Sequence, residues 1–425
     1  MHLDAESCAR AVRAKDARFD GWFFAAVTTT GVYCRPSCPA MPPKPENMRF
    51  FPTAAAAQAA GFRACRRCRP DASPGSPEWN ARADLTARAL RLIADGVVDR
   101  FGVPGLASRL GYSVRQVQRE LLASLGAGPV ALARAQRAQT ARLLIENSSV
   151  PLTDVAFAAG FSSVRSFNDT VRAVYGRTPS SLRSASSSAS LVVRLAFRRP
   201  FSLSVFSQLA SEALPGVEEW RDGAFRRTLR LPRGHGIVSL RPLADHVSCS
   251  LTLSDLRDLS VAIARCRWLL DLDADPVAVD GLLSADPVLE PLVKRDPGRR
   301  VPRTVDPEEF AVRTVCPGPN RLVAAHGTPI EDPGGGLTHL FPDAVTLAKY
   351  DIGGDLVRAL ADRALDLGIG SDWDRARSEL RALGLDTTTV ETIAGRALGD
   401  PDASVDGPAR WRPWRAYAEA YLRET

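Results

Sequence analysis

Four of the eight cysteines in this 425-residue chain form two close pairs, which is the pattern of a metal site. Three residues separate Cys34 from Cys38, and two separate Cys65 from Cys68. Two short loops that each present two thiolates can close a tetrahedron around Zn²⁺. We expect the four remaining cysteines, which are scattered, to be small buried side chains. The spacing therefore predicts one zinc ion bound by Cys34, Cys38, Cys65 and Cys68.

The chemistry of such a site depends on whether one of its sulfurs can react. A thiol that binds zinc loses its proton, so its sulfur is a nucleophile at neutral pH without a general base. Spacing alone favours a purely structural zinc cluster, and the neighbouring residues favour a reactive one. Residues 23–33 are typical of a β-hairpin, which would deliver Cys34 at its end.

The hairpin and the stretches 35–40 (Arg-Pro-Ser-Cys-Pro-Ala) and 60–70 closely resemble the N-terminal domain of the Ada proteins of the bacterial adaptive response to alkylation damage. The resemblance covers about residues 2–72. It implies that all four cysteines bind zinc. It also implies that Cys34, the first of them, irreversibly accepts a methyl group from a DNA methylphosphotriester.

Further contacts follow from the same resemblance. It implies that Thr30 and Arg63 contact the DNA backbone around the damaged phosphate. Many relatives have an Arg three residues after the second cysteine, where this chain has Met41, so one phosphate contact would be missing. Methylation of Cys34 lowers the formal charge of zinc with four thiolates from two minus to one minus. We expect this loss of negative charge beside a polyanion to raise DNA affinity.

The middle of the chain contains an internal repeat. The sequence Leu-Ala-Ser-Arg-Leu-Gly-Tyr-Ser at 106–113 returns as Val-Ala-Phe-Ala-Ala-Gly-Phe-Ser at 155–162. In each copy a short apolar-periodic helix ends at a Gly, and an aromatic residue and a Ser lead into a second helix that the Ser can cap. This is the signature of a helix-turn-helix. A long amphipathic helix, about Val130 to Glu146, would hold the two copies apart.

The second helix of each copy is polar on one face and offers side chains that read base edges in the major groove. In the order of the chain these residues are Arg115, Gln116, Gln118, Arg119, Arg165, Ser166, Asn168 and Arg172. The repeat strongly resembles the AraC-type transcription-factor domain over about residues 84–183. Two ordinary helical hairpins with a solvated basic face are the alternative.

Beyond a Ser/Ala linker at 184–190, the chain reads as alternating strands and then mostly helices from about Leu256. Segments within 224–231, 303–313, 396–403 and 410–417 resemble the AlkA-type 3-methyladenine DNA glycosylases. Those enzymes flip an alkylated base into a pocket and cleave its glycosidic bond with one essential Asp. Their helix-hairpin-helix holds the DNA backbone through a Leu-Pro-Gly-x-Gly turn.

This chain departs from that pattern at each functional point. Residues 383–389 read Leu-Gly-Leu-Asp-Thr-Thr-Thr, so the Pro is absent and Asp386 lies where a phosphate should bind. Relative to that family, we expect the chain to be shorter by about ten residues after Val315 and by about twenty before Arg410. Asp406 is the plausible remnant of the catalytic Asp, whereas Asp400 and Asp402 read as structural. We expect an impaired glycosylase, with exposed apolar faces where helices are missing.

Charge and composition agree with this organisation. Residues 1–190 carry 25 Lys and Arg against 14 Asp and Glu, whereas the whole chain has a net charge of only +7. A basic N-terminal part suits phosphate binding, and a solvated basic face is the alternative. No apolar run approaches the length of a membrane span, and the acidic start does not resemble a signal peptide, so we expect a cytoplasmic protein.

The predicted architecture is multidomain and mainly α with α+β parts. Its four parts are an Ada-like α/β zinc domain at 1–75, an all-α double helix-turn-helix domain at 84–183, an antiparallel β domain at 191–270 and a truncated helix-hairpin-helix region at 271–425. The predicted function is that of an alkylation-response transcription activator and stoichiometric methyltransferase, with double-stranded DNA and RNA polymerase as partners. The alternatives are an additional working 3-methyladenine glycosylase and a DNA-binding regulator whose zinc is only structural.

Overall fold

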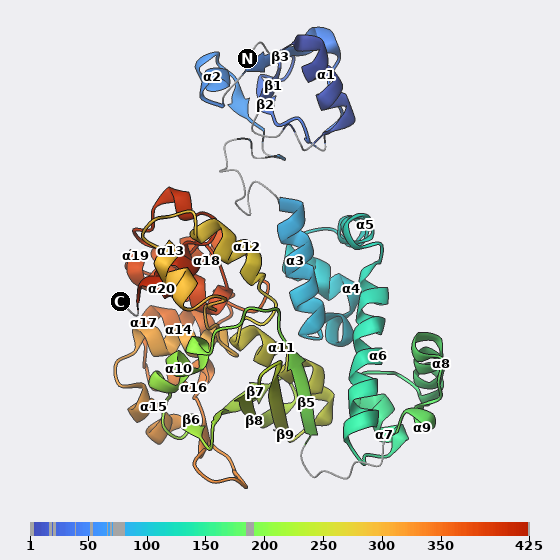
Figure 1. The fold of residues 1–425 in the computed structure, drawn as a ribbon, viewed down its shortest axis with the longest axis vertical. Coiled ribbons are helices and arrows are strands. Elements are labelled where there is room, and N and C mark those ends of the chain that lie inside the picture. Colours follow the sequence, from blue (N-terminus) through green and yellow to red (C-terminus); the bar gives the residue numbers. More distant parts are fainter. Residues whose placement is uncertain are drawn as a thin grey trace. The chain divides into compact units, whose positions relative to one another are not determined.

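The computed structural model describes residues 4–16, 19, 23–38, 40–51, 54–65, 67–68, 70, 81–183 and 191–423. The chain forms two compact units, Met1–Ala87 and Arg88–Thr425 (Figure 1). The Ser/Ala linker expected at 184–190 lies outside the described residues. Within the described part, no helix combines the length and the apolar character that a membrane crossing requires.

The N-terminal unit is a small sheet with a helix on each face. Its strand order is β3-β1-β2-β4, in which β1 pairs antiparallel with β2 and β3, and β2 pairs parallel with β4. Successive residues of β1 point to opposite faces, so Ala25 packs with helix α1 and Ala26 packs with Ala57 of helix α2. The elements are α1 (Ala5–Ala14), β1 (Phe24–Val27), β2 (Val32–Cys34), η2 (Pro45–Asn47), β3 (Met48–Phe51), α2 (Ala54–Ala59) and β4 (Arg63–Ala64).

The second unit begins with the helix-turn-helix region, and its helices confirm the repeat. They are α3 (Ala81–Ala94), α4 (Val97–Leu110), α5 (Val114–Leu125), α6 (Pro129–Asn147), α7 (Leu152–Ala158), α8 (Val164–Tyr175) and α9 (Pro179–Leu182). In the first copy Gly111, with φ +76°, ends α4, and the Ser113 side chain caps α5 by accepting from the Gln116 N–H at 3.2 Å.

The second copy is one residue longer in its turn than the sequence alignment of the repeat implies. The residue that aligns with Ser113 is Ser162, but the side chain that caps α8 belongs to Ser163, which accepts from the Ser166 N–H at 3.2 Å. The expectation for Ser162 was wrong because two adjacent serines offer the same hydroxyl. The backbone of the longer turn brings the second of them to the helix N-terminus.

A five-stranded antiparallel sheet follows, with the strand order β5-β9-β8-β7-β6. The strands are β5 (Leu191–Ala196), β6 (Glu218–Arg221), β7 (Ala224–Leu231), β8 (Gly234–Pro242) and β9 (His246–Leu253). Strict alternation in β5 buries Leu191, Val193 and Leu195. Helices α10 (Ser204–Ser211) and α11 (Leu259–Leu269) pack against the sheet, and η3 (Leu256–Asp258) precedes α11.

The rest of the chain is helical apart from one short β pair, β10 (Thr328–Pro329) with β11 (His339–Leu340). Its helices are α12 (Pro276–Leu283), α13 (Glu290–Arg295), α14 (Pro307–Val315), α15 (Pro319–His326), α16 (Ala344–Ala348), α17 (Gly354–Ala361), α18 (Trp373–Ala382), α19 (Thr387–Ile393), η4 (Ala394–Leu398), η5 (Ala409–Trp411) and α20 (Arg415–Leu422). Despite the expected deletions, these helices bury apolar side chains such as Val357, Leu380 and Ile393 completely.

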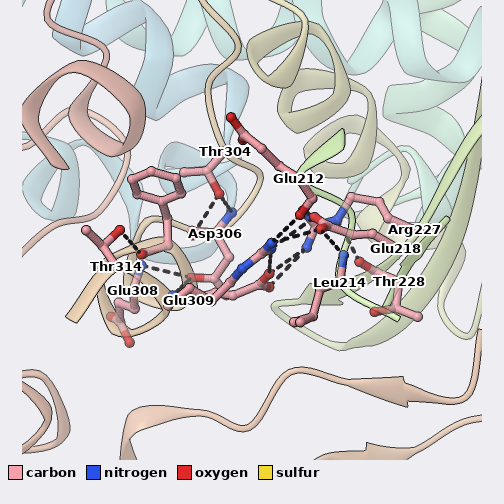
Figure 2. Close-up of polar contacts among 12 residues, drawn as sticks. Glu212, Leu214, Glu218, Arg227, Thr228, Thr304, Asp306, Glu308, Glu309 and Thr314 are labelled. Carbon is pink, nitrogen blue, oxygen red and sulfur yellow. Dashed lines mark hydrogen bonds and ion pairs between the residues drawn. The ribbon is translucent and has the colours of Figure 1, made fainter. Parts of the chain in front are cut away.

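A buried cluster of charges ties the sheet to the helices (Figure 2). The guanidinium of Arg227 on β7, which is 2% exposed, binds Glu218 of β6 at 2.7 Å and Glu309 of α14 at 3.0 Å. Arg313 of α14 binds the same two carboxylates at 3.0 Å each. Two positive and two negative side chains thus neutralise one another, which removes the cost of an unpaired buried charge.

Candidate metal centre and DNA-facing residues

The four cysteines of the two pairs come together in the N-terminal unit. The sulfurs of Cys34, Cys38, Cys65 and Cys68 all lie within 4.8 Å of one another. Cys34 ends β2, and Cys65 follows β4, its parallel neighbour. The Cys65 N–H donates to the Tyr33 carbonyl at 3.0 Å, which extends the pairing of the two strands up to the cluster. Two segments thirty residues apart in sequence are therefore placed side by side by the sheet.

Backbone N–H groups converge on the sulfurs. The Arg35 N–H donates to the Cys68 sulfur at 3.5 Å, and the Cys38 N–H closes a turn on the Arg35 carbonyl at 3.1 Å. Hydrogen bonding with Cys34 is the main cause of the lowered pKa of Cys38 and of Cys65, and the N–H groups of Ala40 and Cys68, respectively, lower these pKa values further. N–H donors stabilise a thiolate more than a thiol, so the surrounding backbone is arranged for negatively charged sulfur.

The donor set fits zinc. Zinc–sulfur bonds of about 2.3 Å in a tetrahedron place the sulfurs about 3.8 Å apart, which lies within the spread of the cluster. Hydrogen bonding with Cys34 lowers the pKa of Cys38 to about 7, and hydrogen bonding with Cys38 raises the pKa of Cys34. The sulfurs are thus close enough to compete for protons, and a divalent cation lets all four be thiolates. When bound, zinc supplies this charge compensation and keeps the Cys34 sulfur deprotonated.

Cys34 differs from the other three cysteines in its exposure. Cys38, Cys65 and Cys68 are buried, whereas Cys34 is half-buried. Its side chain lines a cavity of about 510 Å³ whose walls include Val27 and Val32. Cys38 and Cys65 line the same cavity but are buried, so Cys34 is the most exposed of the three cysteines there.

The other residues that the Ada resemblance implies lie around the same strands. Thr30 is exposed in the β1–β2 turn and lines the cavity together with Met41, which is 90% exposed. Arg63 is exposed on β4 and pairs with Val32, but it is not among the cavity-lining residues. Sequence reasoning missed the apolar walls, Val27 and Val32, although the alternation of the hairpin indicates which residues share a face with Cys34.

The predicted base-reading residues lie on α5 and α8, the second helices of the two copies. Most of them are exposed: Arg115, Gln118, Arg119, Arg165, Ser166 and Arg172. Gln116 and Asn168 are half-buried. In Figure 1, α5 and α8 lie toward the two ends of α6, the long helix that connects the copies. The structure thus gives two polar helix faces held apart by one helix, as the repeat predicts.

The carboxylates of the C-terminal region have different surroundings. Asp400 binds Arg377, and Asp402 binds Arg415 at 2.8 Å, so both have cationic partners. Asp406 is exposed in the loop between η4 and η5. The neighbouring cavity of about 130 Å³ is lined by Ser404 and Val405 but not by Asp406.

A turn with Gly384 at φ +82° connects α18 to α19. Asp386 caps α19: its carboxylate accepts from the Thr389 N–H at 3.0 Å and from the Thr389 hydroxyl at 2.6 Å. These hydrogen bonds, led by that of the hydroxyl, lower the pKa of Asp386. A negative charge of the chain itself thus occupies the helix N-terminus at this turn.

Three family models match the chain in the order of these parts. The metal-binding domain of Ada matches residues 7–71, a helix-turn-helix domain matches residues 106–185, and the AlkA N-terminal domain matches residues 192–306. A probable bifunctional transcriptional activator/DNA repair enzyme AlkA from Mycobacterium tuberculosis is 55% identical over 481 aligned positions, which cover 100% of this chain and 97% of the relative. The chain belongs to this family of bifunctional activator/repair proteins.

Two further similarities concern the N-terminal part. The bifunctional transcriptional activator/DNA repair enzyme Ada of Escherichia coli is 32% identical over 174 residues, which are 41% of this chain and 48% of that protein. The solved DNA methyl phosphotriester repair domain of E. coli Ada is 45% identical and covers 17% of this chain and 79% of the domain, with a TM-score of 0.16. The four-cysteine cluster fits an Ada-type zinc site, because its sulfurs lie together and all four residues fall within the match to the metal-binding domain of Ada.

The alignment with the mycobacterial family member also bears on the expected deletions. It runs over 481 positions, whereas this chain has 425 residues, so the relative fills about 56 positions at which this chain has none. This chain is therefore shorter than its mycobacterial relative within the region over which the two sequences align.

Proposed function

We propose that Cys34 accepts a methyl group from DNA methylphosphotriesters and that the methylated protein activates transcription of repair genes. The observation that carries this proposal is the four-sulfur cluster in which Cys34, half-buried and facing the 510 Å³ cavity, is more accessible than its three buried partners. The match to the metal-binding domain of Ada over residues 7–71 supports it. A purely structural zinc cluster would need no cavity at one of its sulfurs.

The proposed reaction is a direct displacement. The Cys34 thiolate attacks the methyl carbon in line, an S–CH₃ bond forms, and the bond between the methyl carbon and the phosphate oxygen breaks. The leaving group is an ordinary phosphodiester anion, so no proton has to be supplied. The apolar cavity wall at Val27 and Val32 suits an uncharged triester better than a charged diester. The thioether product is stable, so each molecule reacts once.

The reaction changes how the protein meets DNA. Methylation removes one negative charge from the sulfur cluster. Thr30 and Arg63, which we propose as backbone contacts, lie in the β1–β2 turn and on β4. Tighter DNA binding would place the two reading helices, α5 and α8, on a promoter. We propose double-stranded DNA and RNA polymerase as the partners of this activated form.

The test is to measure the mass of the protein and of its peptides by mass spectrometry after incubation with methylphosphotriester DNA. We expect a gain of one methyl group on the peptide that contains Cys34, with Cys249, a buried cysteine of the sheet, left unmodified as an internal control. Cys34→Ser should show no gain. A wild-type chain that binds zinc but gains no mass would leave only the structural zinc cluster.

For the glycosylase-like region we propose impaired catalysis. The expected catalytic remnant, Asp406, is exposed and does not line the neighbouring cavity, and Asp400 and Asp402 are paired with arginines. Asp386 places a carboxylate where the hairpin would meet a phosphate. The alternative, an active 3-methyladenine glycosylase, is favoured by the presence of two helices, α18 and α19, joined by a short turn and by the AlkA N-terminal match.

Release of free base decides between these two. Alkylated DNA incubated with the full chain should yield no 3-methyladenine above the level seen with Asp406→Asn. Release that is abolished by Asp406→Asn, but not by Asp402→Asn, would show that the region is a working enzyme and that Asp406 is its catalytic residue.

A further inference from the structure

The helix-turn-helix region and the glycosylase-like sheet share one hydrophobic core. Leu144 and Ile145 of α6 and Val155 of α7 belong to the same buried cluster as Val193 and Leu195 of β5. Helix α6 contacts both β5 and α11, and α7 contacts η3. β5 is the edge strand of its sheet, and α6 packs along it, so the helix covers an edge that would otherwise be open to pairing.

A polar anchor fixes the turn between α3 and α4 to the sheet domain. The carboxylate of Asp95, a residue only 8% exposed, binds Arg100 at 3.0 Å within its own region and Arg265 of α11 at 3.4 Å. Arg265 also donates to the carbonyl of Arg230 on β7 at 2.9 Å. One guanidinium therefore connects the turn, α11 and the sheet, and its removal would leave a buried carboxylate with a single partner.

A second anchor lies farther along the chain. The Arg88 side chain of α3 is 7% exposed; it donates to the Gly370 carbonyl at 2.8 Å and lies 3.6 Å from the Asp372 carboxylate. Gly370, with φ +92°, lies so close to Leu92 of α3 that a Cβ there would come within 2.8 Å of the leucine side chain. Buried polar contacts and tight packing thus hold α3 against the segment before α18.

The reading faces are left free by this docking. The predicted base-reading residues of α5 and α8 are exposed or half-buried, and Figure 1 shows α8 on the side of α6 that faces away from the sheet. The docked faces are those of α3, α6 and α7, which carry no predicted DNA contact. The platform and the DNA would therefore bind opposite sides of the same helices.

We propose that the glycosylase-like region is a platform for DNA reading: its sheet and α11 hold α6, and through α6 they fix the spacing of the two reading helices. This role rests on the proposed DNA-binding function of α5 and α8, and it requires no glycosylase catalysis. A fixed spacing lowers the cost of ordering two readers on successive major-groove faces, so affinity depends on the docked state. The fold of the glycosylase-like region would then still contribute to DNA binding after its catalytic residues were lost.

The experiment uses the full chain with Arg88→Met and Arg265→Met, singly and together. Methionine keeps much of the apolar stem and removes the hydrogen bonds that fix α3 and the α3–α4 turn to the glycosylase-like region. The matched control is Arg358→Met, which removes an exposed arginine paired with Asp355 on α17 of the same region. Hydrogen exchange is followed for α6–α8 and for β7–β8, and affinity is measured for a duplex selected from random sequence by the wild-type chain.

In the double variant we expect α6–α8 amides to exchange about tenfold faster while β7–β8 stays protected, and the duplex to bind about tenfold more weakly. Arg358→Met should match the wild type in both. Unchanged exchange, or faster exchange with unchanged affinity, would overturn the platform. If β7–β8 also loses protection in the double variant, the sheet itself is destabilised. The two single variants are then compared with the wild type by hydrogen exchange of α6–α8 and by duplex affinity. A wild-type chain that selects no duplex refutes the proposed DNA-reading function instead.

Discussion

Asp386 offers a direct way to test whether the hairpin of the C-terminal region is blocked by its own charge. Asp386→Asn keeps an N-cap, because Asn accepts from the Thr389 N–H as Asp does, and it removes the negative charge. Asp386→Gly removes both the charge and the cap. The pair of variants therefore separates electrostatic repulsion from a change in helix stability.

The expected magnitude follows from the position of the carboxylate at the start of α19. A phosphate that approached these backbone N–H groups would come within about 4 Å of the Asp386 carboxylate, and with the full screening of bulk water the repulsion between two such charges weakens binding about fivefold. Its removal should tighten binding of non-specific duplex DNA about fivefold. Asp386→Gly should show the same gain in affinity together with a small loss of stability, because glycine does not cap the helix with a side chain.

The assay is fluorescence anisotropy with a labelled duplex, in a full chain whose reading helices are weakened by Arg115→Ala and Arg165→Ala. Asp343→Asn is the matched control, because Asp343 caps α16 through the Thr346 N–H at 2.7 Å and carries the same charge away from the hairpin. If the Asp386→Asn variant binds the duplex no more tightly than the Asp343→Asn variant does, the charge of Asp386 does not repel DNA and the reasoning is refuted. The hairpin would then fail to meet DNA for a reason other than its charge.

Three further outcomes are expected. Methylated wild-type protein should bind undamaged duplex about five- to tenfold more tightly than unmethylated protein, as measured by fluorescence anisotropy at fixed salt. The Cys34→Ser variant should show no gain in affinity after the same treatment. Equal affinities of the methylated and unmethylated wild-type protein would contradict the proposal that the loss of one negative charge strengthens DNA binding. Arg227→Met should lower the free energy of unfolding, measured by urea titration, by about 3–5 kcal/mol, because Glu218 and Glu309 then share Arg313 alone. A change of less than about 1 kcal/mol would mean that water solvates these charges. Hydrogen bonds from Arg410, Trp411 and the Val288 N–H lower the pKa of Asp286 to about 2. The stabilising contribution of the Asp286 carboxylate is therefore present above about pH 4 and is lost as the pH falls toward 2. Asp286→Asn should flatten this part of an acid-unfolding curve, and an unchanged curve would contradict the assignment.

Local chemistry in the sequence determined much of this molecule. The two cysteine pairs and the hairpin before Cys34 depend on short loops and on alternation, which act over a few residues, and all four sulfurs meet as predicted. The helix ends at Gly111 and Ser113 follow from glycine's left-handed backbone and from a capping hydroxyl. At Ser162 and Ser163 two equal hydroxyls left the choice to the backbone of the turn.

Tertiary packing decided which apolar faces meet. Periodicity shows that Leu144 of α6 and Val193 of β5 each face a core, but burial in any core satisfies both, so the pattern could not show that the two residues share one core. The same holds for Arg227, whose two carboxylate partners lie 9 and 82 residues away along the chain. The hydrophobic effect has no direction of its own, and ion pairs across such distances form only after the fold has brought the elements together.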